Sequence, residues 1–218
     1  KSYSLVRANM TFATDTVSIV ALSAACVGTV CSFLSIILYA RYVHLHFKFM
    51  KWVFWFSLTA FLVCLNYVVM YLDDNTSIHG LCVFHGVLMM YLEVAMNLWL
   101  FVIAAYTWWF HYHLDQIQSQ GNPLRSMRAI QSAKKYHLWI HYFVWVLSAV
   151  FTFIPLALNA YGIAGTWCWL HSGEDAVRLA FWYIPLWIGL LFMIGFWVDI
   201  MRRSQRMNKL ERDDENYS

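Results

Sequence analysis

The sequence predicts an all-α fold, a polytopic transmembrane helical bundle. Of its 218 residues, 61% are hydrophobic and only 12% are charged, about half the charged share of a typical soluble domain. Five long apolar segments run through the chain, and Lys and Arg gather in alternate connections between them. A soluble core of this size would not bury so much apolar surface, so lipid must be the solvent for much of the chain.

Each apolar segment has the length of a membrane-spanning helix. The segments lie at roughly 17–40, 53–72, 81–110, 138–160 and 176–201. At about 1.5 Å per residue, a helix of each length crosses the ~30 Å hydrocarbon layer. Backbone groups in lipid must be satisfied within the segment, and these segments are too long for barrel strands. The sequence therefore predicts one transmembrane bundle.

The bundle is expected to have polar segments at both ends. We expect an extracellular N-terminal segment at 1–16, the transmembrane bundle at 17–201 and a cytoplasmic polar extension at 202–218. Because the chain begins at Lys1 rather than Met, and its first 16 residues lack the apolar run of a signal peptide, we expect a processed or trimmed product.

The placement of charge predicts the orientation. Basic residues dominate the connections near 41–52 and 111–137, and the C-terminal tail adds five more, whereas the other two connections carry acids: Asp73, Asp74, Glu174 and Asp175. The positive-inside rule then places the N-terminus outside and the tail in the cytosol, as in a multi-pass plasma-membrane protein. Two glycosylation sequons, at Asn9 and Asn75, fall on the predicted outer side and predict a glycoprotein.

The five cysteines divide into two groups. Cys26, Cys31 and Cys64 lie inside predicted helices, where small apolar packing is the simplest interpretation. Cys82 begins the third helix on the outer side and Cys168 lies in the second outer loop, so both face an oxidising compartment in which a disulfide persists. We expect these two to form a disulfide; two free thiols near the surface are the alternative.

This cysteine pair carries a family resemblance. A cysteine at the start of helix three, joined to a Cys-Trp in the second outer loop, resembles the pattern of G-protein-coupled receptors. Trp167-Cys168-Trp169, Arg178, Tyr183 and Pro185 look like the same loop and fifth helix of the slime-mould cyclic AMP receptors and their relatives. The third helix is similar too, with Leu98-Trp99 and Tyr106 at matching places, and the Thr-Trp-Cys-Trp sequence also resembles secretin and adhesion receptors.

The chain departs from that family at two points. Ala60 stands in the second helix where many receptors carry an acid. The family has seven transmembrane helices, whereas five are found here, so the last two were removed, lie outside this chain or never existed in this product. The polar segment after Met201 fits an inner extension of helix five.

Two polar positions are the main candidates for a site inside the bundle. Glu93 and Asn97 are four residues apart on the third helix and are expected to share one face near the bilayer middle. An intramembrane carboxyl normally faces the bundle interior or a wet cavity, so the pair is either a ligand or switch site or a structural clasp with Asn66. Arg178 either meets an anionic ligand group, which the resemblance makes worth testing, or snorkels or pairs with Glu174 or Asp175.

The resemblance implies a receptor that transmits binding of an extracellular ligand to a cytosolic heterotrimeric G protein. The ligand site is expected beneath the second outer loop, between helices three and five, with the following residues: Glu93, Asn97, Trp169, Arg178 and Tyr183. In the second inner loop, Leu124, Met127 and Ile130 form the apolar edge of a short amphipathic turn that also carries Arg125 and Arg128. We expect this turn to contact the G protein; contact of its bases with an anionic membrane surface is the alternative.

Other function classes have less support. Four or five helices with histidines near both membrane faces could hold haem, although only His85 and His141 approach the required placement. No hydrolytic or phosphate-binding motif occurs, so we expect no enzyme activity, no cofactor and no metal. We expect the lipid bilayer as a partner and no nucleic acid. The leading alternative to the receptor is a five-helix accessory or channel subunit.

Overall fold

The computed structural model describes the backbone of most of the chain. The described ranges are 2–42, 48–72, 79–120, 137–164, 167–171 and 173–215. Side chains are described over a smaller part, namely 19–42, 50–71, 80–113, 137–164, 168–171 and 173–206.

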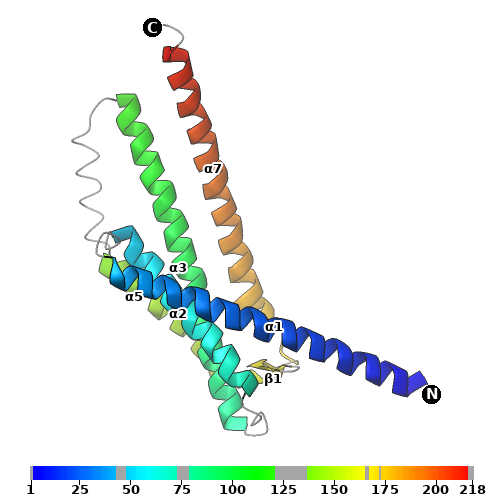
Figure 1. Cartoon of the computed structure of the whole chain (residues 1–218). Helices are drawn as coiled ribbons and strands as arrows, with labels where there is room; N and C mark the ends of the chain where they lie inside the picture. The colour runs from blue at the N-terminus through cyan, green and yellow to red at the C-terminus, as the bar shows by residue number, and fades with distance from the viewer. Residues whose placement is uncertain are drawn as a thin grey trace.

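Long helices make up nearly all of the described chain (Figure 1). Their bounds are α1 Ser2–Arg41, α2 Lys48–Leu72, α3 His79–Gln120, α5 His137–Ala157 and α7 Ile184–Glu215. The short α6, Asp175–Arg178, and the π-helix η4, Leu179–Tyr183, lead directly into α7. Within the described residues, five helical spans are long and apolar enough to cross a membrane, which confirms the predicted all-α membrane bundle.

The helix α3 is the centre of the bundle. Helix α1 packs on α2, α2 packs on α3, and α5 and α7 each pack along α3 but contact one another little. A buried aromatic cluster joins α2, α3 and α5 through Trp52, Trp99 and Val144. In Figure 1, α3 and α7 run side by side away from the short strands toward the C-terminal end.

The close approach of α1 to α2 depends on Gly28. A Cβ atom at this position would lie 2.7 Å from the sulfur of Cys64, a distance at which either the thiol or one of the two helices would have to shift. Small residues commonly allow such approaches between membrane helices. Cys64 therefore packs as expected, whereas Cys26 and Cys31 are exposed on α1, so the packing interpretation is wrong for these two.

A β-hairpin follows α5, where the sequence predicts only a loop. Helix α5 ends at Ala157 because Asn159 adopts a left-handed conformation with φ 54°, which asparagine tolerates better than most residues. The amides of Asn159 and Ala160 then bond to the carbonyls of Leu156 and Pro155, a Schellman-type ending. Strand β1, Tyr161–Ala164, turns back as β2, Trp167–Leu170, in an antiparallel pair.

Candidate functional site

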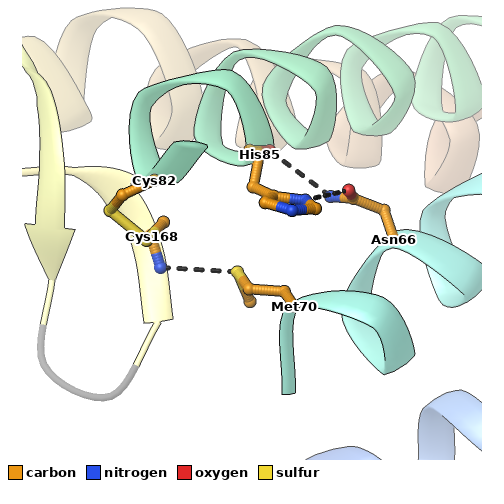
Figure 2. Close-up of a disulfide and its surroundings, with 5 residues drawn as sticks. All are labelled: Asn66, Met70, Cys82, His85 and Cys168. Atoms are coloured by element: carbon orange, nitrogen blue, oxygen red, sulfur yellow. Dashed lines mark hydrogen bonds between the residues drawn. A yellow bond between two sulfur atoms is a disulfide. The ribbon is translucent and has the colours of Figure 1, made fainter. Parts of the chain in front are cut away.

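The disulfide attaches the hairpin to the end of α3. Cys82 and Cys168 are bonded with sulfurs 2.06 Å apart and Cα atoms 5.1 Å apart, and both are almost fully buried. The amide of Cys168 also donates to the sulfur of Met70 on α2, at 3.4 Å (Figure 2). The hairpin is therefore held against two helices, and we call this end of the bundle the hairpin end.

The hairpin lies directly on α3 because of Gly86. A Cβ atom there would lie 3.2 Å from the ring of Tyr161 and 3.4 Å from the backbone of Trp169. Tyr161 is buried beside Met90, and its hydroxyl donates to the carbonyl of Thr152 at 3.1 Å. Burial raises the pKa of the Tyr161 phenol, so the hydroxyl remains a proton donor at physiological pH.

Arg178 is engaged by the hairpin rather than facing an open site. Its Nε and Nη2 donate to the carbonyl of Leu170 at 3.1 and 2.5 Å. Its guanidinium carbon lies 5.6 Å from the ring centre of Trp169. The ion pair forms with Asp175, at 3.8 Å, and because that carboxylate is 88% exposed it adds little stability. Of the alternatives, pairing with an acid occurs, but the main partner of Arg178 is a backbone carbonyl.

Glu93 points into the bundle, toward α2. It is only 9% exposed, and the hydroxyl of Tyr67 donates to its Oε1 at 3.2 Å. Asn66, expected as its clasp partner, instead pairs with His85. The two side chains lie 2.7 Å apart, and the Asn66 amide also donates to the His85 carbonyl at 3.3 Å (Figure 2). The expected clasp between Glu93 and Asn66 is therefore wrong. The rotation of α2 brings Tyr67, not Asn66, to Glu93.

Asn97 has different neighbours from Glu93, although the two lie one turn apart. It lines a cavity of about 270 Å³ between α3, α5 and the η4–α7 segment. Aromatic and aliphatic side chains make almost all of the wall: Val94, Leu98, Phe101, Phe143, Leu147, Phe151, Phe181, Trp182, Pro185, Leu186, Ile188, Phe192 and Met193, with Gly189 completing it. Glu93 and Asn97 were expected to share one set of neighbours, but Glu93 contacts α2 whereas Asn97 faces the cavity.

The expected ligand residues converge only in part. Asn97 lines the cavity, and Trp169 contacts its wall edge-on through Trp182, with ring centres 5.8 Å apart. Glu93, Arg178 and Tyr183 are not part of the lining. Two residues of this region were not expected from the sequence: Tyr67, which bonds to Glu93, and Trp182, which lines the cavity. In the sequence, each is marked only by being next to an expected residue, Asn66 or Tyr183.

A second polar cluster joins α3 to α7 at the end opposite the hairpin. The indole of Trp108 donates to Asp199 Oδ2 at 2.8 Å, and Arg203 Nε donates to the same oxygen at 2.7 Å. The Arg203 guanidinium carbon also lies 4.9 Å from the ring centre of Tyr112. Trp108 therefore links α3 to α7 through a hydrogen bond as well as through packing.

The histidines do not form a haem site from His85 and His141. His85 lies near the hairpin end, whereas the ring of His141 lies 4.9 Å from that of Trp99. Trp99 is 14 residues further along α3 than His85, about 21 Å at the helical rise. Two side chains so far apart do not ligate one iron. Within the described residues, no group of three or more potential metal ligands occurs.

Several expected residues cannot be placed. Leu124, Arg125, Met127 and Arg128 lie outside the described residues, as does Asn75. Asn9 belongs to α1, but its side chain is outside the described part.

Comparison with known proteins adds a receptor likeness. No protein-family model matches the chain. The chain is 31% identical over 108 residues to a protein named Ascaroside receptor GPR2 from Arthrobotrys oligospora, a match that covers 49% of this chain and 23% of that protein. The matched part thus spans less than a quarter of the relative's length. Together with the five apolar helices, this likeness indicates a receptor-like membrane protein.

Proposed function

We propose that this protein is a G-protein-coupled receptor and that the five apolar helices are five of the receptor's seven transmembrane helices. The observation that carries the proposal is the hairpin bonded through Cys168 to Cys82 at the start of α3, above a cavity between α3 and α7. The named receptor that resembles half of the chain supports the same interpretation. A ligand acts in this arrangement only by binding one packing of the helices better than another.

The finer placement rests on sequence patterns. The Trp-Cys-Trp sequence with Arg178, Tyr183 and Pro185 supports a receptor of the slime-mould cyclic AMP receptor-like branch. We place the protein in the plasma membrane, with its N-terminus outside and its tail in the cytosol, because basic residues gather on one side. On this orientation the hairpin is extracellular, and Asn9 and Asn75 are glycosylated.

Ligand recognition is assigned to the region beneath the hairpin. Asn97 and the aromatic wall behind Trp169 are the most direct candidates, because they border open space. Glu93 and Tyr183 do not line the cavity, so any effect on the ligand is indirect. Glu93 contacts α2 through Tyr67, and Tyr183 lies on η4, which carries part of the cavity wall. Arg178 holds the hairpin and is available to an anionic ligand only if its bonds to Leu170 are exchanged.

The test is G-protein activation by the full-length protein in cells, measured by energy transfer between labelled G-protein subunits. The panel includes cyclic AMP and ascarosides, the second because the relative is named for them. We expect one ligand class to raise the signal. A protein that never engages a G protein and instead purifies as a stable oligomer with other membrane proteins would point to the accessory-subunit alternative.

The proposed contact with the G protein has its own test. Replacing Leu124 and Met127 together by Asp puts two charges on the apolar edge of the second inner loop. We expect coupling to be lost while ligand binding and surface expression remain normal, because two unpaired carboxylates are costly to bury in an interface. Replacement of Arg125 and Arg128 by Gln is the matched control for membrane attraction. Normal activation by the Asp variant would make the loop a connector only.

A further inference from the structure

The cavity beside Asn97 has an almost entirely apolar wall. Asn97 carries the only amide among the lining residues, and none of them is charged. The wall closes toward the hairpin through Phe151 and Phe181, whose ring centres lie 6.0 Å apart. Phe181 and Trp182 belong to η4, and π-helical turns of this kind occur frequently at functional sites.

The cavity exists because of how three helices pack. Helices α5 and α7 both contact α3 but contact each other little, so a space remains between them. Its rim residues Phe143, Ile188 and Phe192 are each more than half exposed. The cavity therefore opens onto the surface of the described bundle, within the membrane-spanning part of all three helices.

Water is a poor occupant of such a space. An apolar cavity of about 150 Å³ in a soluble protein stays dry and takes up apolar molecules, and this cavity is larger, at about 270 Å³. Leaving it empty forfeits the dispersion contacts of its lining. At membrane depth the surrounding medium is hydrocarbon, so an aliphatic chain is the occupant that matches both the wall and the medium.

Asn97 adds a polar requirement. Its amide makes no hydrogen bond with another described residue, whereas an amide in hydrocarbon needs a partner to offset its desolvation. We propose that the cavity binds the aliphatic chain of a single-chain amphiphile whose ester, amide or hydroxyl group bonds to Asn97. The amphiphile is either a bilayer lipid or a lipid-like ligand that enters from the bilayer. The proposal rests on the proposed function in that it names the ligand class of the same cavity, and its test measures binding without G-protein activation, so the two can fail separately.

Two glycines of α7 provide a matched pair of variants. Gly189 lines the cavity, and a Cβ atom there would meet no atom within 4 Å. A larger side chain at this position therefore fills the cavity without displacing the backbone. Gly195 also has open space around its Cβ position but does not line the cavity. Gly189→Phe thus removes the room for a ligand, and Gly195→Phe controls for the change of glycine to phenylalanine in the same helix.

The experiment uses the full-length protein in lipid nanodiscs with a photoactivatable monoacylglycerol carrying a diazirine in its chain. Labelled residues are mapped by mass spectrometry. We expect labels on Phe101 or Leu147, reduced about tenfold or more by Gly189→Phe and unchanged by Gly195→Phe. Equal labelling in the two variants, or labels confined to outward residues such as Leu191, would overturn the proposal. If Gly189→Phe does not fold, Leu147→Trp takes its place.

Two further arms define the ligand. Asn97→Leu should reduce labelling by the monoacylglycerol about tenfold but leave labelling by a diazirine alkane unchanged; equal effects on both probes would contradict the bond to Asn97. Mass spectrometry of co-purified lipids identifies a resident bilayer lipid. Loss of labelling when a soluble amphiphile is added before irradiation, with no co-purified lipid, identifies a diffusing ligand.

Discussion

At the residue scale, two charged groups of the described bundle, Arg178 and Glu93, have defined hydrogen-bond partners. Arg178 donates twice to the carbonyl of Leu170, so it secures the hairpin to the start of the α6–η4–α7 segment. Glu93 accepts from Tyr67 and links α3 to α2. Burying a carboxyl at this depth costs free energy unless it has a hydrogen-bond partner, and Tyr67 supplies that partner.

Replacement of Arg178 by Met tests its structural role. Met has similar length but no donor, so the Leu170 carbonyl loses both bonds, at an expected cost of about 1–3 kcal/mol in stability. The measurement is the thermal melting temperature of the purified protein in detergent. Asp175→Asn is the control and should change stability by less than about 0.5 kcal/mol, because that ion pair is exposed. Equal losses from both variants would show that charge, not carbonyl binding, matters at Arg178.

The second residue-scale prediction concerns Glu93. Replacing it by Leu should reduce surface expression or signalling far more than Leu100→Ala, a change at a partly exposed position on the same helix. A double-mutant cycle of Glu93→Leu with Tyr67→Phe should give a coupling of roughly 0.6–1.7 kcal/mol, typical of hydrogen bonds between membrane helices. Additive effects of the two changes would refute the pairing.

At the element scale, the hairpin and α3 form one unit. Gly86 allows the strands to contact α3, and the disulfide joins residues 86 apart in sequence. The Schellman-type turn at Asn159 directs the chain from α5 into β1. The wall of the cavity depends on this unit, because Trp169 of β2 packs against Trp182.

Removal of the disulfide tests that unit. The double variant Cys82→Ser with Cys168→Ser should lose about 4–5 kcal/mol in the chain-entropy account for so long a loop, with a large fall in melting temperature. Cys64→Ser, a change at a cysteine outside the disulfide, is the control and should have a smaller effect. A melting temperature unchanged in the double variant would show that packing of Tyr161 and Met90 alone holds the hairpin.

At the scale of the whole molecule, α3 connects two clusters at opposite ends. The hairpin end is tied by Cys82, and the other end is tied to α7 by Asp199, which accepts from both Trp108 and Arg203. The separation of α5 from α7 leaves the cavity between these ends. The cavity thus lies along the same two helices, α3 and α7, that this cluster joins at the opposite end.

Asp199→Ala should loosen the far ends of α3 and α7. Trp108 and Arg203 both lose their acceptor, so we expect a wider separation between spin labels placed on these two helices beyond the cluster, measured by pulsed electron resonance. Under the proposed function, basal G-protein activation should also change. Arg206→Ala, at an exposed position one turn further on, is the control. Identical distance distributions in the two variants would mean that the cluster does not hold the helices.

Sequence reasoning succeeded where the physics is local. The five spans follow from apolar length, because transfer of a segment into lipid depends on its own composition and backbone satisfaction. Cys82 and Cys168 could be paired because their places relative to the spans put both at one end, whereas the three other cysteines lie within helices.

The tertiary structure alone decided which side chains meet. Helix rotation and close approach set the partners, and these depend on contacts between distant residues, such as Gly28 with Cys64 and Gly86 with Tyr161. That is why Glu93 pairs with Tyr67 rather than Asn66, and why Asn97, one turn away, faces a cavity instead. Composition determined that this chain lies in a membrane, and the packing of the other helices on α3 determined where its open space and its buried polar pairs lie.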